Sequence, residues 1–342
     1  MKLPEQVIEE YNIGIVDSVV PLHGGIIHKT WQVKTDLGSF ILQKVNPIYT
    51  SLIMEDIQAV LEYLELHGFQ VMKIVETRNK NLYVPDDSGF WRIFTYIEGK
   101  SYHQINDPQI SYEAGKLLGS YHRSFSNLKY NFKHKRIINN NIPLLYQKYK
   151  DAVVNNNNPE IALMIPVIDK MIELDLPSHL RKTVNHGDPK ISNFIFLNNL
   201  PYKAIAMVDF DDCGKNYNVL HELGDAFRSW SWNPEKSNEP FDVSLFTMAL
   251  RGYYEGSKGF LFKEEWDLIP QAIKLNLLQL ISRFIRDFFE DIYFEWDPTR
   301  YTSRKEHNLA QAKEYFALYE DICRKEKRII DAMSEVRNSF KF

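Results

Sequence analysis

The chain has 342 residues, of which 44% are apolar and 25% are charged, and its formal net charge is −4. This length exceeds that of a usual single core, so we expect a soluble globular protein with one large lobe or two unequal lobes. The weak charge argues against nucleic acid as a partner, and two cysteines provide neither a disulfide framework nor a metal-binding cluster. The N-terminus lacks the apolar stretch of a signal peptide, and no apolar run approaches the ~18 residues of a membrane span, which predicts a cytoplasmic protein with no membrane partner.

The first hundred residues predict a small sheet with one long helix. Their β-branched and aromatic runs are separated by glycine-containing turns, which is typical of strands joined by hairpins. One stretch instead repeats apolar residues at a helical period, with Thr50 or Ser51 as its N-cap and Gly68 at its end. The expected order is strand, strand, strand, helix, strand and strand, at residues 15–22, 29–35, 39–45, 50–68, 80–84 and 90–97.

Beyond these strands the pattern becomes mostly helical. Asp107, followed by a proline, provides the N-cap of a helix over 107–125. Apolar and charged positions at helical spacing predict a long structural helix over 305–335. The change in composition therefore predicts two domains, residues 1–98 and 99–342.

Two short predicted strands, at 193–197 and 203–210, interrupt the helical region. The turn at 198–201 should pair them antiparallel, which places Asn193 roughly opposite Asp209. An amide oxygen and a carboxylate at adjacent strand ends are good ligands for Mg²⁺, which prefers hard oxygen donors. We therefore predict a magnesium site where these two strands meet.

Asp188 lies on the loop that enters the first of these strands, five residues before Asn193. Pro189 restricts the backbone of Asp188 and so fixes the direction of its carboxylate. Phosphoryl transfer needs a base for the hydroxyl proton and cations that neutralise phosphate charge. In protein kinases the catalytic aspartate is likewise followed five residues later by a metal-binding asparagine. The spacing thus predicts a kinase that uses ATP and Mg²⁺.

Longer motifs extend this pattern over most of the chain. They are "FILQKVN" at 40–46, "HGDPKISN" at 186–193, "VDFDD" at 208–212, "ELGDAFRSW" at 222–230 and "SRFIRDFFEDIYF" at 282–294. In these motifs the chain resembles the phosphotransferase family of aminoglycoside phosphotransferases, choline kinases and N-acetylhexosamine 1-kinases, most closely the last. The resemblance implies an α+β, bilobal protein-kinase-like fold, with a small mixed β-sheet N-lobe and a larger, mostly helical C-lobe.

The resemblance also implies roles at the catalytic centre. Asp188 would be the catalytic base that accepts the proton of the substrate hydroxyl, and Asn193 and Asp209 would be catalytic as the ligands of Mg²⁺. His186 would support the loop by a hydrogen bond to the backbone near Asp209. Asp225 would support the same loop rather than touch substrate.

For the nucleotide, the resemblance implies a glycine hairpin over the triphosphate and a hinge whose backbone binds adenine. A basic residue of the third strand would contact the phosphates and pair with an acid of the long helix. Gln43 and Lys44 point to opposite faces of that strand, and either could hold this position; we favour Lys44. The predicted nucleotide-binding residues are Gly24, Gly25, Lys44, Glu55, Thr95, Tyr96 and Ile97.

The substrate implied by the resemblance is a sugar such as an N-acetylhexosamine, phosphorylated at its anomeric hydroxyl by a monomer or homodimer. Arg228, Arg283 and Asp287 would bind it together with Asp188. Arg228 and Asp225, three positions apart, equally suit an internal salt bridge. The alternative acceptor is an aminoglycoside, choline or another amino alcohol, because acidic residues gather near the site.

Two other classes of protein are weaker alternatives. A non-catalytic pseudokinase-like binding module would not be expected to keep Asp188, Asn193 and Asp209 together. A metal-dependent hydrolase built on His186 and the two aspartates would need further histidine ligands, and the sequence shows no such spacing.

Overall fold

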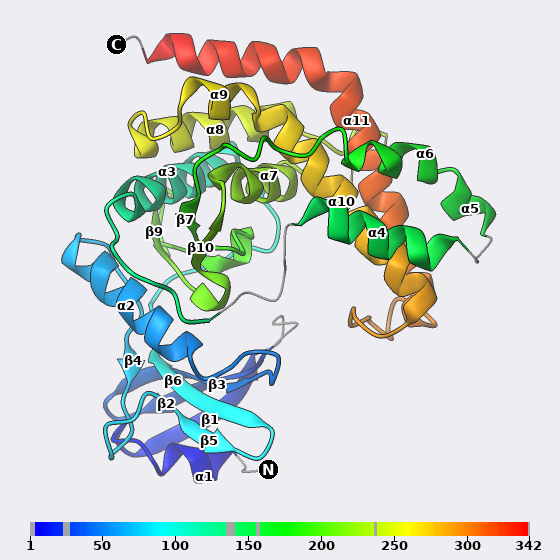
Figure 1. Ribbon diagram of the computed structural model, residues 1–342. Coiled ribbons are helices and arrows are strands. Elements are labelled where there is room, and N and C mark those ends of the chain that lie inside the picture. Colours follow the sequence, from blue (N-terminus) through cyan, green and yellow to red (C-terminus); the bar gives the residue numbers. More distant parts are fainter. Residues whose placement is uncertain (1–3, 23–27, 135–140, 155–157, 236–237, 341–342) are drawn as a thin grey trace.

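Two lobes of unequal size make up the chain, as the computed structural model shows in Figure 1. The N-terminal residues form a sheet lobe, and the rest of the chain forms a larger lobe of helices. The structure describes residues 4–22, 28–134, 141–154, 158–235 and 238–340. The bilobal α+β architecture expected from the sequence is therefore confirmed, while the domain boundary at 98/99 stays a prediction.

The N-lobe is a six-stranded sheet whose pairings are all antiparallel, rather than mixed. The strands lie in the order β1-β2-β3-β6-β4, and β5 also pairs with β6. Thr35 pairs with Gly38, which confirms the predicted tight turn between the second and third strands. The bounds are β1 (Val16–Leu22), β2 (Lys29–Thr35), β3 (Gly38–Val45), β4 (Ile74–Val75), β5 (Val84–Asp86) and β6 (Gly89–Thr95).

The strand predicted over 80–84 lies later in the chain. The N–H of Thr77 donates to the carbonyl of Asn81 (2.9 Å), and Thr77 Oγ1 accepts from the N–H of Asn81 (3.0 Å). Lys80 inside this turn has a φ of +63°. Lys80 and Asn81, which the β-rich pattern had placed in a strand, belong to this turn, so β5 begins only at Val84.

Two helices cover opposite faces of this sheet. On the outer face, α1 (Pro4–Ile8) packs with Leu42, Trp91 and Ile93. On the inner face, α2 (Ile53–Leu66) packs with Phe90 and Phe94. Because side chains alternate along a strand, a residue on β3 or β6 faces either α1 or the helical lobe, according to its parity.

The C-lobe consists of helices around two small two-stranded sheets. The helix predicted over 107–125 is confirmed, since the Asp107 carboxylate accepts the N–H of Gln109 (2.8 Å) as its N-cap. The helices are α3 (Pro108–Phe125), α4 (Ile142–Val153), α5 (Pro159–Ala162), α6 (Ile165–Ile168), α7 (Val219–Trp230), α8 (Val243–Ser257), α9 (Lys263–Asp267), α10 (Ile269–Glu290) and α11 (Arg304–Ser339). The strands are β7 (Thr183–Asn185), β8 (Phe194–Phe196), β9 (Ala204–Met207) and β10 (Gly214–Tyr217).

The predicted pairing of the two central strands is confirmed. β8 and β9 pair antiparallel, with Phe194 opposite Met207. The carbonyl of Asn193 accepts the N–H of Val208 (2.9 Å), so Asn193 lies one position from Asp209 across the hairpin.

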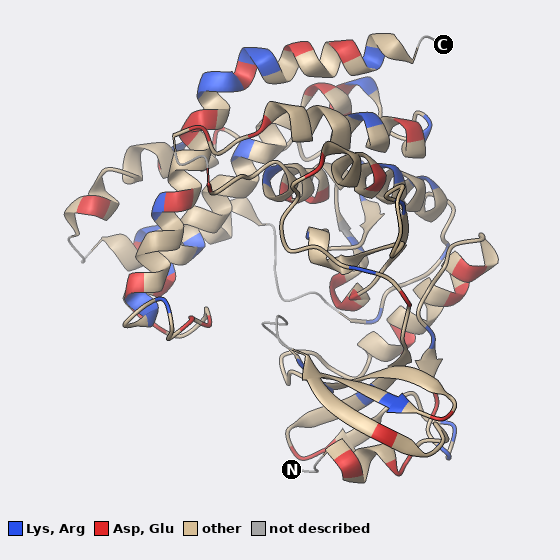
Figure 2. Ribbon diagram, turned by 180° about the vertical axis from the view of Figure 1, so that it is seen from behind, with Lys and Arg blue, Asp and Glu red and all other residues tan. Residues whose placement is uncertain are grey.

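Basic and acidic side chains alternate along α11, the long C-terminal helix (Figure 2). Lys325 of this helix is buried and donates to Asp321 (2.8 Å) and to the carbonyl of Phe241 (2.9 Å). Among the described residues, no helix is long and apolar enough to cross a membrane.

The connection between the lobes is held on its N-terminal side by the sheet. The N–H of Thr95 donates to the carbonyl of Lys73 (2.9 Å), and that of Tyr96 donates to the carbonyl of Ser39 (3.1 Å). The N–H groups of Thr95 and Tyr96, two of the predicted nucleotide-binding residues, are therefore already used inside the N-lobe.

The same connection is held on its other side by the β8–β9 hairpin. Lys100 exchanges two backbone hydrogen bonds with Phe196, each 2.8 Å long. A Cβ on the preceding Gly99 would lie 2.5 Å from the carbonyl oxygen of Phe196, so only glycine allows this close approach. The chain thus enters the C-lobe fixed to the end of β8.

Candidate active site

His186 anchors the loop that precedes β8. Its Nε2 donates to the carbonyl of Val208 (2.9 Å), and its Nδ1 accepts the N–H of Asp188 (3.3 Å). Both bonds require the same neutral tautomer, and burial lowers the pKa of His186 in agreement. The predicted hydrogen bond from His186 to backbone next to Asp209 is confirmed.

The support from α7 comes from Glu222 rather than from Asp225. The buried Glu222 carboxylate accepts the backbone N–H of His186 at 2.9 and 3.1 Å. His122 on α3 lies behind it, with Nε2 3.4 Å from Glu222 Oε2. The prediction that Asp225 supports the loop is wrong in this respect: its carboxylate binds Arg228 instead, with Arg228 Nε 3.0 Å away.

Two further residues fix the loop on either side of Asp188. Gly187 has a φ of +95°, and a Cβ there would lie 2.4 Å from the carbonyl oxygen of Asp212. Trp230, on the last turn of α7, donates its indole N–H to the carbonyl of Pro189 (2.8 Å). Trp230 therefore holds the carbonyl of the proline that directly follows Asp188.

Four polar side chains of the loop and the hairpin lie close together: Asp188, Lys190, Asn193 and Asp209. Lys190 Nζ lies 2.6 Å from Asp188 Oδ2 and 3.9 Å from Asp209 Oδ2. Asn193 Nδ2 donates to the carbonyl of Asp188 (2.9 Å), so its amide oxygen is the atom that could coordinate a cation. Burial opposes the charge on Lys190, but Asp188 and Asp209 outweigh it and raise its pKa. Lys190 is thus a fixed cation between the two carboxylates.

The residues present fit a divalent cation. Asp209 has a left-handed backbone (φ +70°) that starts the short turn 210–212 and brings its carboxylate close to that of Asp211. Burial and the carboxylates of Asp211 and Asp188 hold the pKa of Asp209 well above its usual range. A divalent cation would relieve this crowding, and the donors are the hard oxygens that Mg²⁺ prefers.

His28, the residue directly before β2, also lies near these carboxylates. Ligand atoms of His28, Asp209 and Asp211 lie within 4.8 Å of one another. The Nδ1 of His28 accepts the N–H of Asn46 (3.1 Å), which places the ring proton on Nε2, the atom 3.7 Å from Asp211 Oδ2. In this tautomer His28 faces Asp211 as a donor and cannot ligate a metal through Nε2.

The N-lobe cation that reaches the C-lobe is Arg92 on β6, not Lys44. Lys44 lies on the outer face of the sheet, 92% buried, with its Nζ 2.5 Å from Asp86 Oδ2. Gln43 occupies the inner face opposite Arg92 and accepts its Nε–H (2.9 Å). The placement of Lys44 contradicts the prediction that it contacts phosphate, because the sheet separates it from Asp211 and the catalytic loop.

Glu55 is not the partner of an N-lobe cation either. Its carboxylate is exposed and pairs with Lys133. The α2 residues that turn inward are its neighbours: Met54 Sδ lies 3.8 Å from Arg92, and Asp56 accepts backbone N–H groups of the segment after α3. The register of α2 therefore turns Glu55 away from Arg92 and toward the segment after α3.

Of the remaining predicted nucleotide-binding residues, one keeps a backbone N–H that is available to a ligand. Gly24 and Gly25 lie outside the described residues. The N–H groups of Thr95 and Tyr96 are engaged in the sheet, whereas that of Ile97, the third of these predicted nucleotide-binding residues, makes no hydrogen bond within the described part of the chain.

The predicted substrate residues separate into two groups. Arg228 is held by Asp225 and by Asn276 (3.0 Å), which confirms the internal salt bridge, and Asp188 contributes to the rise in its pKa. Asp287 is buried at the end of α10 and accepts three backbone N–H groups of residues 292–294. The placement of Asp287 does not support substrate binding, because its carboxylate already accepts these hydrogen bonds as a cap at the end of the helix.

Arg283, one turn before Asp287, lies over aromatic rings. Its guanidinium is 5.3 Å from the ring of Tyr293 and 5.4 Å from that of Phe294, and it donates to the Tyr293 hydroxyl (3.0 Å). It makes no pair with Asp287, so substrate contact by Arg283 stays a prediction.

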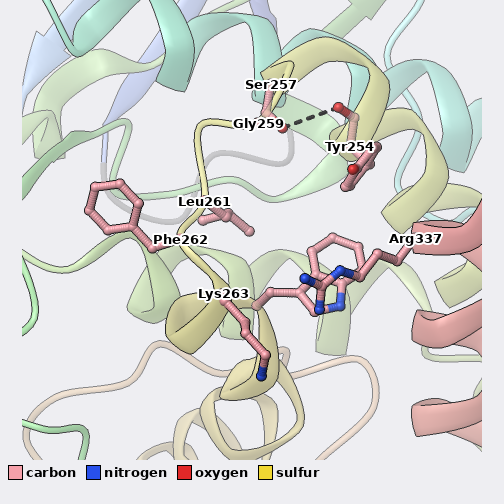
Figure 3. Close-up of a pocket in the computed structure, with 8 residues that line it drawn as sticks. Tyr254, Ser257, Gly259, Leu261, Phe262, Lys263 and Arg337 are labelled. Carbon is pink, nitrogen blue, oxygen red and sulfur yellow. Dashed lines mark hydrogen bonds between the residues drawn. The ribbon is translucent and has the colours of Figure 1, made fainter. Parts of the chain in front are cut away.

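A cavity of about 100 Å³ lies elsewhere in the C-lobe, between the end of α8, α9 and α11 (Figure 3). The residues that line it include Tyr254, Leu261, Lys263, Trp266 and Arg337. Ligand pockets usually have several times this volume. None of the predicted site residues lines it, so it is not a candidate for the nucleotide.

Sequence comparison defines the family. A model described as "Phosphotransferase enzyme family" matches residues 18–257, which is 240 of the 342 residues. The chain belongs to this family. The matched range of this phosphotransferase runs from β1 to the end of α8 and so includes the loop 186–193 and the N-lobe sheet.

A curated relative of this phosphotransferase is the hydroxylysine kinase of Bos taurus. The two are 28% identical over 182 residues, which is 47% of this chain and 48% of the relative. The chain thus matches about half the length of that relative. The family predicted from the motifs is confirmed, and the closer likeness to N-acetylhexosamine 1-kinases stays a prediction.

Solved structures share the fold of this phosphotransferase. A microcompartment-associated aminopropanol kinase has a TM-score of 0.70 at 16% identity and covers 94% of this chain and 97% of its own. An amicoumacin kinase in complex with AMP-PNP and Ca²⁺ gives 0.67 at 16%, with 92% and 93% covered. The choline kinase of Cryptosporidium parvum gives 0.57 at 15%, with 97% and 95% covered. At these identities the likeness shows the kinase-like fold alone.

Proposed function

We propose that the protein is an ATP- and Mg²⁺-dependent kinase that transfers the γ-phosphate to a hydroxyl group of a small molecule carrying an amine. The observation that carries the proposal is the meeting of Asp188, Lys190, Asn193 and Asp209 at one point. A base, a fixed cation and two oxygen ligands for a metal are the parts that phosphoryl transfer requires.

Asp188 is the base in this proposal. Its carboxylate would accept the proton of the acceptor hydroxyl as the oxygen attacks the γ-phosphorus in line with the leaving ADP oxygen. His186 and Trp230 hold the backbone on both sides of Asp188, so its carboxylate keeps one direction. Lys190 Nζ lies 2.6 Å from that carboxylate and would also stabilise the charge on the transferred group.

Asn193 and Asp209 would hold Mg²⁺ through the amide oxygen and the carboxylate. The metal, when bound, neutralises charge on the β- and γ-phosphates of ATP. The left-handed backbone of Asp209 and the bond from Val208 to Asn193 keep the two donors adjacent. The adenine would bind beside Ile97, and the triphosphate would extend from there toward Asp209.

An amine-bearing acceptor is favoured over a sugar by two observations. The curated relative that the chain matches over half its length is named as a hydroxylysine kinase, whose substrate by that name carries amines and a hydroxyl. In addition, Asp287 of the predicted sugar-binding helix is consumed as a cap. Arg228 and Asp225, joined to each other beside the loop, would line the acceptor site.

Substitution of the base tests the mechanism. Asp188→Asn should abolish ATP-dependent phosphorylation, while the variant should bind Mg-ADP with the affinity of the wild type. Asp151→Asn, on the exposed face of α4, is the matched control with normal turnover. Near-normal turnover by Asp188→Asn would overturn the assignment of the base.

A panel of acceptors tests the substrate class. ADP release should be measured with hydroxylysine, aminopropanol, choline, an aminoglycoside and N-acetylhexosamines. We expect turnover with an amine-bearing member. Turnover with an N-acetylhexosamine alone would overturn the proposal of an amine-bearing acceptor and support the predicted sugar substrate. Failure of the wild type to bind Mg-nucleotide at millimolar concentration would support a non-catalytic module.

A further inference from the structure

Arg92 and Asp211 form an ion pair that joins the two lobes directly. Arg92 Nη1 and Nη2 each donate over 2.7 Å, to Oδ1 and Oδ2 of Asp211 respectively. The exposed fractions are 1% for Arg92 and 5% for Asp211. The two parallel bonds are the fork geometry that gives an arginine–carboxylate pair both strength and a single orientation. Arg92 belongs to β6 of the N-lobe, and Asp211 belongs to the turn after β9 of the C-lobe.

Gln43 fixes the direction of this arginine. It lies opposite Arg92 in the register of β3 and β6, and its Oε1 accepts the Nε–H of Arg92 at 2.9 Å. The ring of Phe94 lies 4.9 Å from the guanidinium carbon. Gln43 is therefore a positioning residue for the arginine, in the strand where a phosphate-contacting lysine was expected.

The acidic end of the pair is coupled to the metal site. Asp211 follows Asp209 by two residues within one tight turn, 210–212. Both oxygens of the buried Asp211 carboxylate accept hydrogen bonds from the positively charged Arg92. His28, the residue directly before β2, faces the same carboxylate at 3.7 Å. Two N-lobe side chains, Arg92 and His28, thus face the turn 210–212, and Gln43 orients the first of them.

We propose that Arg92 and Asp211 are the lobe-coupling pair of this kinase: Arg92, oriented by Gln43, holds the Asp209 turn against the N-lobe in the conformation that binds Mg-nucleotide. The pair takes over the coupling that a strand lysine and a helix glutamate provide in protein kinases. The inference rests on the proposed function, because it concerns how the same nucleotide site is held closed.

The expected change in nucleotide affinity follows from the fraction of protein molecules in the closed arrangement. A ligand that binds only the closed arrangement has an apparent Kd equal to its intrinsic Kd divided by the closed fraction. Loss of the pair leaves one buried charge without a partner and so favours separation of the lobes. A fall of the closed fraction to roughly one tenth raises the apparent Kd about tenfold.

A double-mutant cycle tests the coupling. The Kd for Mg-ADP should be measured by calorimetry on folded protein for the wild type, Arg92→Met, Asp211→Asn and the double variant. We expect each single change to raise the Kd by about tenfold or more, and the double change to raise it no further than the weaker single variant, because both remove one interaction. Arg92→Lys, which keeps the charge but loses the fork, should be intermediate.

The same sheet offers a matched control. Lys44 and Asp86 form a second buried ion pair on β3 and β5, on the face away from the C-lobe. Lys44→Met should lower the melting temperature, as Arg92→Met does, yet leave the Kd for Mg-ADP unchanged.

The outcomes separate the two proposals. If the wild type binds no Mg-ADP, the proposed kinase function fails. If the wild type binds and the Arg92 and Asp211 variants bind equally well, or if Lys44→Met weakens binding to the same extent, the coupling inference fails while the kinase function stands.

Discussion

Trp230→Phe perturbs the support of the catalytic loop without touching its charged residues. Trp230 is 1% exposed, and its indole N–H is 2.8 Å from the carbonyl of the buried Pro189, the residue after Asp188. Phenylalanine keeps the aromatic packing against Phe194 but leaves this carbonyl unpaired, which costs about 1–3 kcal/mol. The smaller ring adds a cavity cost of about 1 kcal/mol. We expect the free energy of unfolding to fall by the sum, about 2–4 kcal/mol.

The same substitution should reduce turnover beyond its effect on stability. A Pro189 carbonyl free to turn releases Asp188 from its single direction, and a barrier increase of about 1.4 kcal/mol lowers kcat roughly tenfold. The assay is coupled ADP release at a temperature where the variant is folded, beside denaturant unfolding. Trp266→Phe is the control, since Trp266 is 6% exposed and packs edge-on against Tyr254 in α8. The reasoning is refuted if Trp230→Phe loses stability but keeps wild-type kcat, or if Trp266→Phe loses kcat equally.

Three more outcomes are expected. Gly187→Ala should lower stability by about 1–3 kcal/mol and also reduce kcat, because its φ of +95° and the Asp212 carbonyl 2.4 Å away exclude a Cβ; wild-type values for both would contradict this. Burial lowers the pKa of His186 below its ordinary value of 6.5. The free energy of unfolding that depends on the neutral ring is therefore fully present above pH 6.5 and is lost as the pH falls toward the pKa of the folded protein. The stability advantage of the wild type over His186→Gln should shrink between pH 7 and pH 5, and a constant advantage would refute this prediction. Asp287→Ala should cost about 2–5 kcal/mol by leaving buried N–H groups unpaired while kcat is unchanged; a loss of kcat at unchanged stability would restore Asp287 as a substrate residue.

The pairing that brings Asn193 beside Asp209 was predictable because it is local in sequence. A strand, a short turn and a second strand bring Asn193 beside Asp209, and a proline after Asp188 restricts its backbone, so spacing alone indicates which residues meet. Glu222 was harder to recognise. Its role depends on which face of α7 turns toward the backbone of His186, and that is decided by the packing of distant helices.

The N-lobe cation was mispredicted because strand parity does not say which face meets the other lobe. Gln43 and Lys44 differ only in parity, and the position of α1 on the outer face decides between them. The sequence could have indicated a buried ion pair at Arg92, because an arginine at a core position of an apolar strand needs an acidic partner. Its partner Asp211 lies 119 positions later, so no local pattern could name it.

The residues between the lobes form a very short pivot. Backbone pairing with the sheet continues to Tyr96 and resumes at Lys100 on the end of β8, which leaves Ile97, Glu98 and Gly99 as the segment about which one lobe can rotate. A base bound beside Ile97 would lie on the rotation axis and hardly move when the lobes open. The phosphate end, far from that axis, would travel most. Nucleosides and nucleotides should therefore respond differently to anything that opens the lobes: adenosine would keep its affinity, and ATP would lose it.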